Sequence, residues 1–274
     1  MDAQIILVPY DSGHCRKRMG NGPDRIVEHG LRDLLNEIGI RFDAEEIQLE
    51  NPFPTEISAA FEVARKLSLR VHDCRNQGKF PIVLSGNCNA AVGTVSGCGP
   101  GKTGVIWFDA HGEANTPEAT RSGFLDGMPI STLLGRAWQT LAKTIPGFAP
   151  VRGDHIILFG ARQFDWAEPA LLDQAGVRRV ETVGKMTNEL QALVTLVEQI
   201  YLHVDLDVLD PTEATSNQWT PAEGINLQTL LDAIAEVRKR ANLAGLGIAS
   251  YDPAVDQDGR ALSAALDVVK ASLT

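Results

Sequence analysis

Short apolar runs rich in β-branched residues recur along the chain, and segments with a different apolar spacing separate them. There are eight such runs, at residues 5–9, 46–49, 81–85, 104–110, 155–161, 177–183, 201–209 and 243–250. Intervening segments such as residues 57–77 and 227–241 place apolar residues three and four positions apart, as amphipathic helices do. The pattern therefore predicts eight strands that alternate with helices.

Alternating strands and helices predict a parallel sheet covered by helices, either closed as a barrel or open and doubly wound. We find no internal repeat and no linker rich in Pro, Gly or Ser, so we expect a single domain over residues 1–274. Polar residues gather in four loops, each after a predicted strand: residues 85–89, 111–127, 163–168 and 210–223. Functional residues of both fold types lie beyond the carboxyl ends of the strands, so these loops are the predicted site.

Composition and charge narrow the possible ligands. The 274 residues are 44% hydrophobic and carry a formal net charge of −10, so no basic field attracts nucleic acid or an anionic membrane. A small soluble or cationic ligand fits this charge better. The apolar run near the amino end is too short for a signal peptide, and no stretch is long enough for a membrane span, so we expect a cytoplasmic protein. The four cysteines form no CxxC pair, and we expect them to be reduced.

Two clusters of metal-type ligands follow predicted strands. Asp109, His111 and Glu113 alternate after one strand, and Asp205 and Asp207 alternate at the end of another, so each set is expected to share one face. A lone DxD is more often a turn or a helix cap, but several buried carboxylates are costly unless cations neutralise them. Carboxylates with one imidazole favour Mn²⁺ or Mg²⁺, and a pair of such ions activates water, so the clusters predict a hydrolase.

Four segments of the chain resemble motifs of the arginase (ureohydrolase) family, and they occur along the chain in the same order as in that family. WFDAHGEANTPEATRSGFLDG (residues 107–127) is similar to the family's DAHxDxN segment, and HVDLDVLDP (203–211) to its SxDxDxxDP. SGNCNAAVGTVSG (85–97) resembles GGDHSxxxGxxxG, and FGARQFDWAE (159–168) resembles GxRxxDxxE. The resemblance implies a three-layer α/β/α fold around an eight-stranded, mostly parallel sheet, which resolves the choice against a barrel.

The resemblance also implies a site for two Mn²⁺ ions. It makes Asp109 and Asp205 bridging ligands, and His111 and Asp207 ligands of one ion. The other ion would be held by Cys88 and Glu113, which depart from the family's His and Asp. A thiolate binds divalent ions well, and the alternative is that Cys88 is a small core thiol.

A substrate pocket follows from the same resemblance. Asn115 and Ser122 match positions that hold the substrate's α-carboxylate, and Asp165 and Glu168 match those that hold its α-amino group. The alternative for the two acids is a solvated helix start. At the reacting end, Ser250 replaces a carboxylate that faces the guanidinium, and Asp126 replaces a proton-shuttling His. Asp126 is the candidate proton relay, the alternative being a cap of its turn or of the helix predicted at residues 129–135.

The loss of the carboxylate favours a neutral substrate over a guanidinium. An Nω-hydroxyguanidine is much less basic, and a Cys ligand without a shuttle His resembles the family branch that acts on Nω-hydroxy-L-arginine in D-cycloserine biosynthesis. The expected reaction yields L-ornithine and hydroxyurea. Alternatives are an arginase, another amidinohydrolase including one for formiminoglutamate, a barrel enzyme with one Mg²⁺, and a metal-poor pseudoenzyme that binds a ligand or partner. The sequence leaves monomer and homo-oligomer open.

Overall fold

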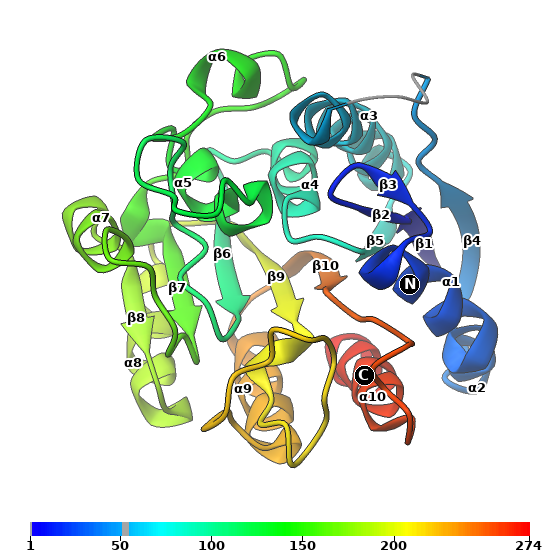
Figure 1. The fold of residues 1–274 in the computed structure, drawn as a ribbon. Helices are drawn as coiled ribbons and strands as arrows, with labels where there is room; N and C mark the ends of the chain where they lie inside the picture. The colour runs from blue at the N-terminus through cyan, green and yellow to red at the C-terminus, as the bar shows by residue number, and fades with distance from the viewer. Residues whose placement is uncertain (1, 51–54) are drawn as a thin grey trace.

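The computed structural model describes residues 2–50 and 55–274, and its centre is an eight-stranded sheet in which every pairing is parallel (Figure 1). The strand order is β4-β1-β5-β10-β9-β6-β7-β8. The strands are β1 (Asp2–Val8), β4 (Arg41–Glu46), β5 (Lys79–Ser85), β6 (Thr103–Phe108), β7 (Ile156–Phe159), β8 (Arg178–Val180), β9 (Gln199–Asp205) and β10 (Leu243–Ala249). A separate antiparallel hairpin joins β2 (Tyr10–Asp11) to β3 (His14–Cys15).

Helices cover both faces of the sheet. They are α1 (Gly22–Ile26), α2 (Arg32–Glu37), α3 (Glu56–Asn76), α4 (Ala90–Cys98), α5 (Pro129–Leu133), α6 (Gln139–Ala142), α7 (Glu168–Ala175), α8 (Val183–Leu193), α9 (Leu227–Arg240) and α10 (Arg260–Leu273). One apolar core joins the sheet to α1, α2, α8, α9 and α10, and two further cores join its other face mainly to helices α3 to α7. The predicted three-layer α/β/α arrangement is therefore confirmed.

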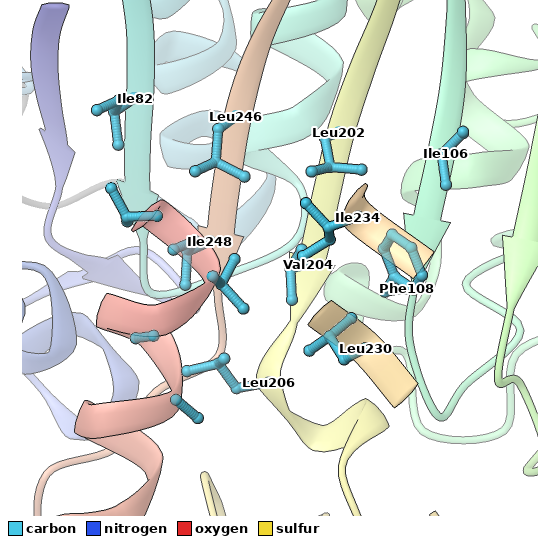
Figure 2. Packing of buried hydrophobic residues seen from close by; sticks show 14 of the residues in the cluster. Ile82, Ile106, Phe108, Leu202, Val204, Leu206, Leu230, Ile234, Leu246 and Ile248 are labelled. Carbon is cyan, nitrogen blue, oxygen red and sulfur yellow. The ribbon is translucent and has the colours of Figure 1, made fainter. Parts of the chain in front are cut away.

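The larger core shows how strand residues of one parity build this fold. Leu202 and Val204 of β9 lie between Leu246 and Ile248 of β10 and the β6 side chains, and α9 and α10 pack over them (Figure 2). Alternate residues of a strand face opposite sides, so Tyr201, His203 and Asp205 point toward the other layer. Apolar burial on both faces explains the continuous hydrophobic runs in the sequence.

Two features of the predicted elements are wrong in detail. The strand expected at residues 46–49 lies instead at Arg41–Glu46, an edge strand with mostly exposed or half-buried side chains and a weak hydrophobic signal. The strand expected at residues 201–209 ends at Asp205, because a short 3₁₀ turn at Leu206–Val208 follows it. The helices expected at residues 57–77 and 227–241 agree with α3 and α9 to within a residue.

The sheet order brings functional loops together. Strands β5, β10, β9 and β6 are consecutive neighbours in the middle of the sheet, and because all are parallel their carboxyl ends meet at one edge (Figure 1). Chain segments far apart in sequence therefore converge there, as open α/β sheets require of a site. Among the described residues, none of the helices has the length and apolar character needed to cross a membrane.

Candidate active site

The loops after four neighbouring strands, β10, β9, β6 and β7, line most of one pocket with a volume of about 370 Å³. Most of the residues predicted from the sequence line it: His111, Glu113, Asn115, Ser122, Asp126, Asp165, Glu168, Asp205, Asp207 and Ser250. Cys88 and Asp109 lie behind this surface, both almost fully buried. The structure therefore brings the predicted metal, substrate and relay residues to one place.

The candidate metal ligands form two groups that share Asp109. Ligand atoms of Cys88, Asp109 and Asp205 lie within 4.8 Å of one another, and so do those of Asp109, His111 and Asp207. This pattern suits two cations with a shared carboxylate. The Cys88 thiol donates to Asp205 Oδ2 over 3.0 Å, and His111 Nδ1 lies 3.2 Å from Asp207 Oδ2.

Glu113 joins neither group, and its backbone differs from the prediction. Its φ of +52° breaks the extended alternation that was expected from Asp109 onward. Its side chain is nevertheless buried, and Oε2 has no hydrogen-bond partner among the described residues. A buried carboxylate oxygen without a partner is costly, so this atom fits a cation.

Asp205 and Asp207 come together through a turn, which corrects the expected strand alternation. Asp205 ends β9, and its Oδ1 accepts from the Asp207 backbone N–H over 2.9 Å at the start of the 3₁₀ turn. Asp207 Oδ1 in turn accepts from the Ala110 N–H over 3.2 Å. The carboxylates are therefore held by the backbone of two neighbouring segments.

Burial and mutual repulsion perturb the acids. Burial, followed by the charge of Asp207, raises the pKa of Asp205 well above its usual range, and burial with the charge of Asp109 does the same for Glu113. Burial alone would lower the pKa of His111, but hydrogen bonds with Asp109 and Asp207 raise it to about 11. Cations placed between these carboxylates would relieve the repulsion, which is the chemistry of a metal site.

The expected head-group residues also cluster. Asn115 Nδ2 donates to Asp165 Oδ2 over 2.8 Å, and the Asn115 Oδ1 atom is buried without a partner among the described residues. Glu168 begins α7 and is buried, so the alternative of a solvated helix start is wrong for it. Its Oε1 accepts from the Ala114 N–H and its Oε2 from the Asp165 N–H. Glu168 thus joins the two loops.

Asp126 caps a helix, but a different one from the helix expected. Its Oδ1 accepts from the backbone N–H and the side-chain amide of Asn89, at the start of α4. Within the described residues, α5 has no side-chain cap, so the alternative in which Asp126 caps the helix that follows it is wrong. Burial raises the pKa of Asp126 to about 8.

Sequence reasoning missed two side chains. Asn217 is buried in the pocket wall and donates to the Ser250 carbonyl over 2.9 Å; its only sequence signal was its place in the polar loop at residues 210–223. His203 lies behind Cys88, with Nε2 3.2 Å from the sulfur, and burial lowers its pKa to about 3. The signal available in the sequence was that His203 stands where the family's SxDxDxxDP segment has Ser.

Comparisons with known proteins agree with this geometry. The family model described as "Arginase family" matches residues 1–274. An arginase of Bacillus caldovelox is 30% identical in an alignment of 234 residues that covers 77% of this chain and 77% of its own, and an arginase of Bacillus subtilis (strain 168) is 26% identical over 98% of this chain and 96% of its own. A crystal structure of arginase from Bacillus subtilis superposes with a TM-score of 0.87 at 25% identity, covering 100% of this chain and 98% of that one. The chain belongs to the arginase family, and it is a hydrolase of amidino C–N bonds.

Proposed function

We propose that the protein hydrolyses Nω-hydroxy-L-arginine to L-ornithine and hydroxyurea with two Mn²⁺ ions. The observation that carries this proposal is the reacting end of the pocket, where Ser250 stands in place of the family's carboxylate. Ser250 is buried, and its hydroxyl lies 3.5 Å from the Cys88 sulfur. This end therefore offers a neutral group to the substrate.

The donor set fits the binuclear metal centre of the family, which typically contains manganese. We assign Asp109 and Asp205 as shared ligands, with His111 and Asp207 on one ion and Cys88 and Glu113 on the other. Support comes from the two ligand groups that share Asp109 and from the partnerless Glu113 Oε2. Two such ions lower the pKa of water and so supply a nucleophile at neutral pH.

The head-group assignments complete the substrate pose. One N–H of Asn115 Nδ2 contacts Asp165, so the second can donate to an α-carboxylate beside the Ser122 hydroxyl. Asp165 and Glu168 supply acceptors for the α-amino group, because each Glu168 oxygen keeps a lone pair beyond its backbone contact. Holding the head group fixes the side-chain carbon near the metal ligands, which makes attack effectively unimolecular.

Charge then discriminates between substrates. The arginine side chain stays protonated near neutral pH, whereas the electron-withdrawing oxygen makes an Nω-hydroxyguanidine much less basic. Two unit charges about 4 Å apart interact by about 4 kcal/mol at an effective dielectric constant of about 20. A guanidinium beside two dications needs a nearby carboxylate, and Ser250 supplies none. A neutral hydroxyguanidine does not carry this penalty.

The test compares kcat/KM for the two substrates with manganese-loaded protein, using ornithine as the common product. We expect at least a 100-fold preference for Nω-hydroxy-L-arginine. Ser250→Glu should raise L-arginine turnover, and the matched neutral control Ser250→Gln should not, because the two variants share size and differ in charge. Equal rates for both substrates with the natural protein would refute the charge argument.

L-arginine hydrolysis is the second candidate, and the names of the relatives support it. The same assay separates the two activities. A pseudoenzyme is distinguished by metal analysis, since about two manganese ions per chain are expected here and none for a ligand-binding protein. Roles in D-cycloserine biosynthesis, a cytoplasmic location and one domain over residues 1–274 stay predictions.

A further inference from the structure

Two departures from the family pattern lie in direct contact. Cys88 stands where the family segment has His, and His203 stands where SxDxDxxDP has Ser. The two positions are 115 residues apart in the chain, yet the imidazole Nε2 lies 3.2 Å from the sulfur. Both side chains are almost fully buried. The small residue and the imidazole have thus exchanged places between two touching positions.

The hydrogen-bond directions around the sulfur agree with each other. The Cys88 thiol donates to Asp205 Oδ2, so its lone pairs face His203. His203 Nε2 must then carry the proton, and Nδ1, 3.0 Å from the Tyr201 hydroxyl, must accept. The Tyr201 hydroxyl then donates to Nδ1, and the N–H at Nε2 is directed at the sulfur.

The sheet is built to hold this imidazole. His203 pairs directly with Trp107 on β6 and with Gly247 on β10. The Trp107 ring lies over the imidazole with centroids 3.8 Å apart, while its indole N–H donates to Asp109 Oδ2. A Cβ at Gly247 would stand 2.0 Å from the Tyr201 hydroxyl and 3.2 Å from His203 Nδ1. The missing side chain at Gly247 lets this pair reach across β10 to Cys88.

We infer that Cys88 and His203 form one coupled unit, in which His203 is the positioning residue that holds the Cys88 sulfur for the metal. The inference rests on the proposed assignment of Cys88 as a ligand. An imidazole at position 88 cannot fit while His203 fills the space behind it, and a Ser at position 203 would leave the sulfur without its donor. Each replacement is therefore tolerated only with the other.

The first experiment measures manganese stoichiometry and affinity in Cys88→His, His203→Ser and the double variant, with unfolding of metal-free protein as the folding control. We expect Cys88→His alone to weaken binding of one ion at least 100-fold, and the double variant to recover to within about tenfold of the natural protein. Recovery in the double variant also supports the proposal if the single variant unfolds. The coupling is overturned if Cys88→His binds both ions as tightly as the double variant does.

A second experiment isolates the hydrogen bond with cobalt as the probe metal. His203→Phe keeps the ring beside Trp107 but removes the N–H, and His203→Gln keeps a donor. We expect His203→Phe to lower cobalt affinity by about 10- to 100-fold, as loss of a partner to a ligand does, and His203→Gln to retain most of it. Equal affinity in His203→Phe and the natural protein would contradict the positioning role.

The same spectra distinguish failure of the underlying assignment. A thiolate ligand gives a sulfur-to-cobalt charge-transfer band in the near ultraviolet, which Cys88→Ser must abolish. If the natural protein binds cobalt without that band and Cys88→Ser binds it equally well, Cys88 is no ligand and the proposed metal site is wrong. If the band is present and the His203 variants leave both band and affinity unchanged, only the coupling fails.

Discussion

Arg162 holds the loop that carries Asp207 through hydrogen bonds, so its removal should lower both the stability of the fold and the affinity for metal. Its guanidinium donates to the carbonyl oxygens of Asp207 (3.1 Å), Val208 (3.2 Å), Pro221 (2.7 Å) and Ala222 (2.9 Å). These contacts join the turn after β9 to the far end of the following loop. The planar Arg162 guanidinium has several N–H donors and can bind several carbonyl oxygens at once, which a lysine ammonium cannot match.

The magnitude follows from these four contacts. A hydrogen bond to a charged group contributes about 1.5 to 3 kcal/mol, but Arg162 is half-buried and water can replace part of each contact. We therefore expect Arg162→Met, which keeps the aliphatic stem, to lower the free energy of unfolding by about 3 kcal/mol. Manganese affinity should fall about tenfold, because the Asp207 backbone is no longer held. The free energy of unfolding and the manganese affinity of Arg162→Lys should lie between those of Arg162→Met and those of the natural protein.

The assay is urea denaturation of metal-free protein together with manganese titration of the folded form. Arg152→Met is the matched control, since the Arg152 side chain is 70% exposed and pairs only with Asp154 among the described residues. Its loss should cost less than about 0.5 kcal/mol. A change below about 1 kcal/mol in Arg162→Met, with unaltered manganese affinity, would refute the reasoning.

Two further predictions concern acids in the same region. Asp126→Asn keeps an oxygen for the Asn89 contacts but removes the ionisable carboxyl group. We therefore expect turnover to fall by about 100-fold at unchanged manganese content. Unchanged turnover would leave Asp126 as a helix cap only. Hydrogen bonds from the Thr212 hydroxyl and N–H and from the Gly224 N–H lower the pKa of Asp210 from 3.8 to about 2. Its contribution to stability is therefore complete above about pH 4 and lost as the pH falls toward about 2. Denaturation of metal-free protein from about pH 5 to about pH 3 should show a steeper loss of stability in the natural protein than in Asp210→Asn, and parallel curves would contradict this.

The sequence predicted the fold well where burial is two-sided. Central strands such as β6 and β9 are buried along their length, so each appears as a continuous apolar run. Within the described part of the chain, the edge strand β4 pairs with β1 alone, and its side chains are mostly exposed or half-buried. The prediction was placed instead on the apolar residues Ile47 and Leu49 that follow it. The pattern of apolar residues reflects which side chains are buried, and an edge strand buries few of its side chains.

The structure brings the predicted site residues together, but their backbone differs from the prediction. Strand parity led to Asp205 and Asp207, although a 3₁₀ turn brings them together. Parity likewise failed at Glu113, where φ is positive. Local patterns could not show that His203 contacts Cys88, because that contact depends on which strands become neighbours. The resemblance to a family supplied the choice of an open sheet over a barrel, which periodicity could not make.

Three of the departures from the family pattern, Cys88, His203 and Ser250, meet at the Cys88 sulfur, which argues for altered chemistry over decay. Ser250 and His203 both contact the Cys88 sulfur, and Asp126 holds the N–H of Asn89, the next residue along the chain. Loss of function without selection would scatter substitutions and leave buried polar atoms unpaired. Among the described residues, however, the two buried side-chain oxygen or nitrogen atoms without partners belong to Glu113 and Asn115, which face the pocket where a cation and a substrate would bind. A site whose replaced residues contact one another is the arrangement that the proposed change of substrate requires.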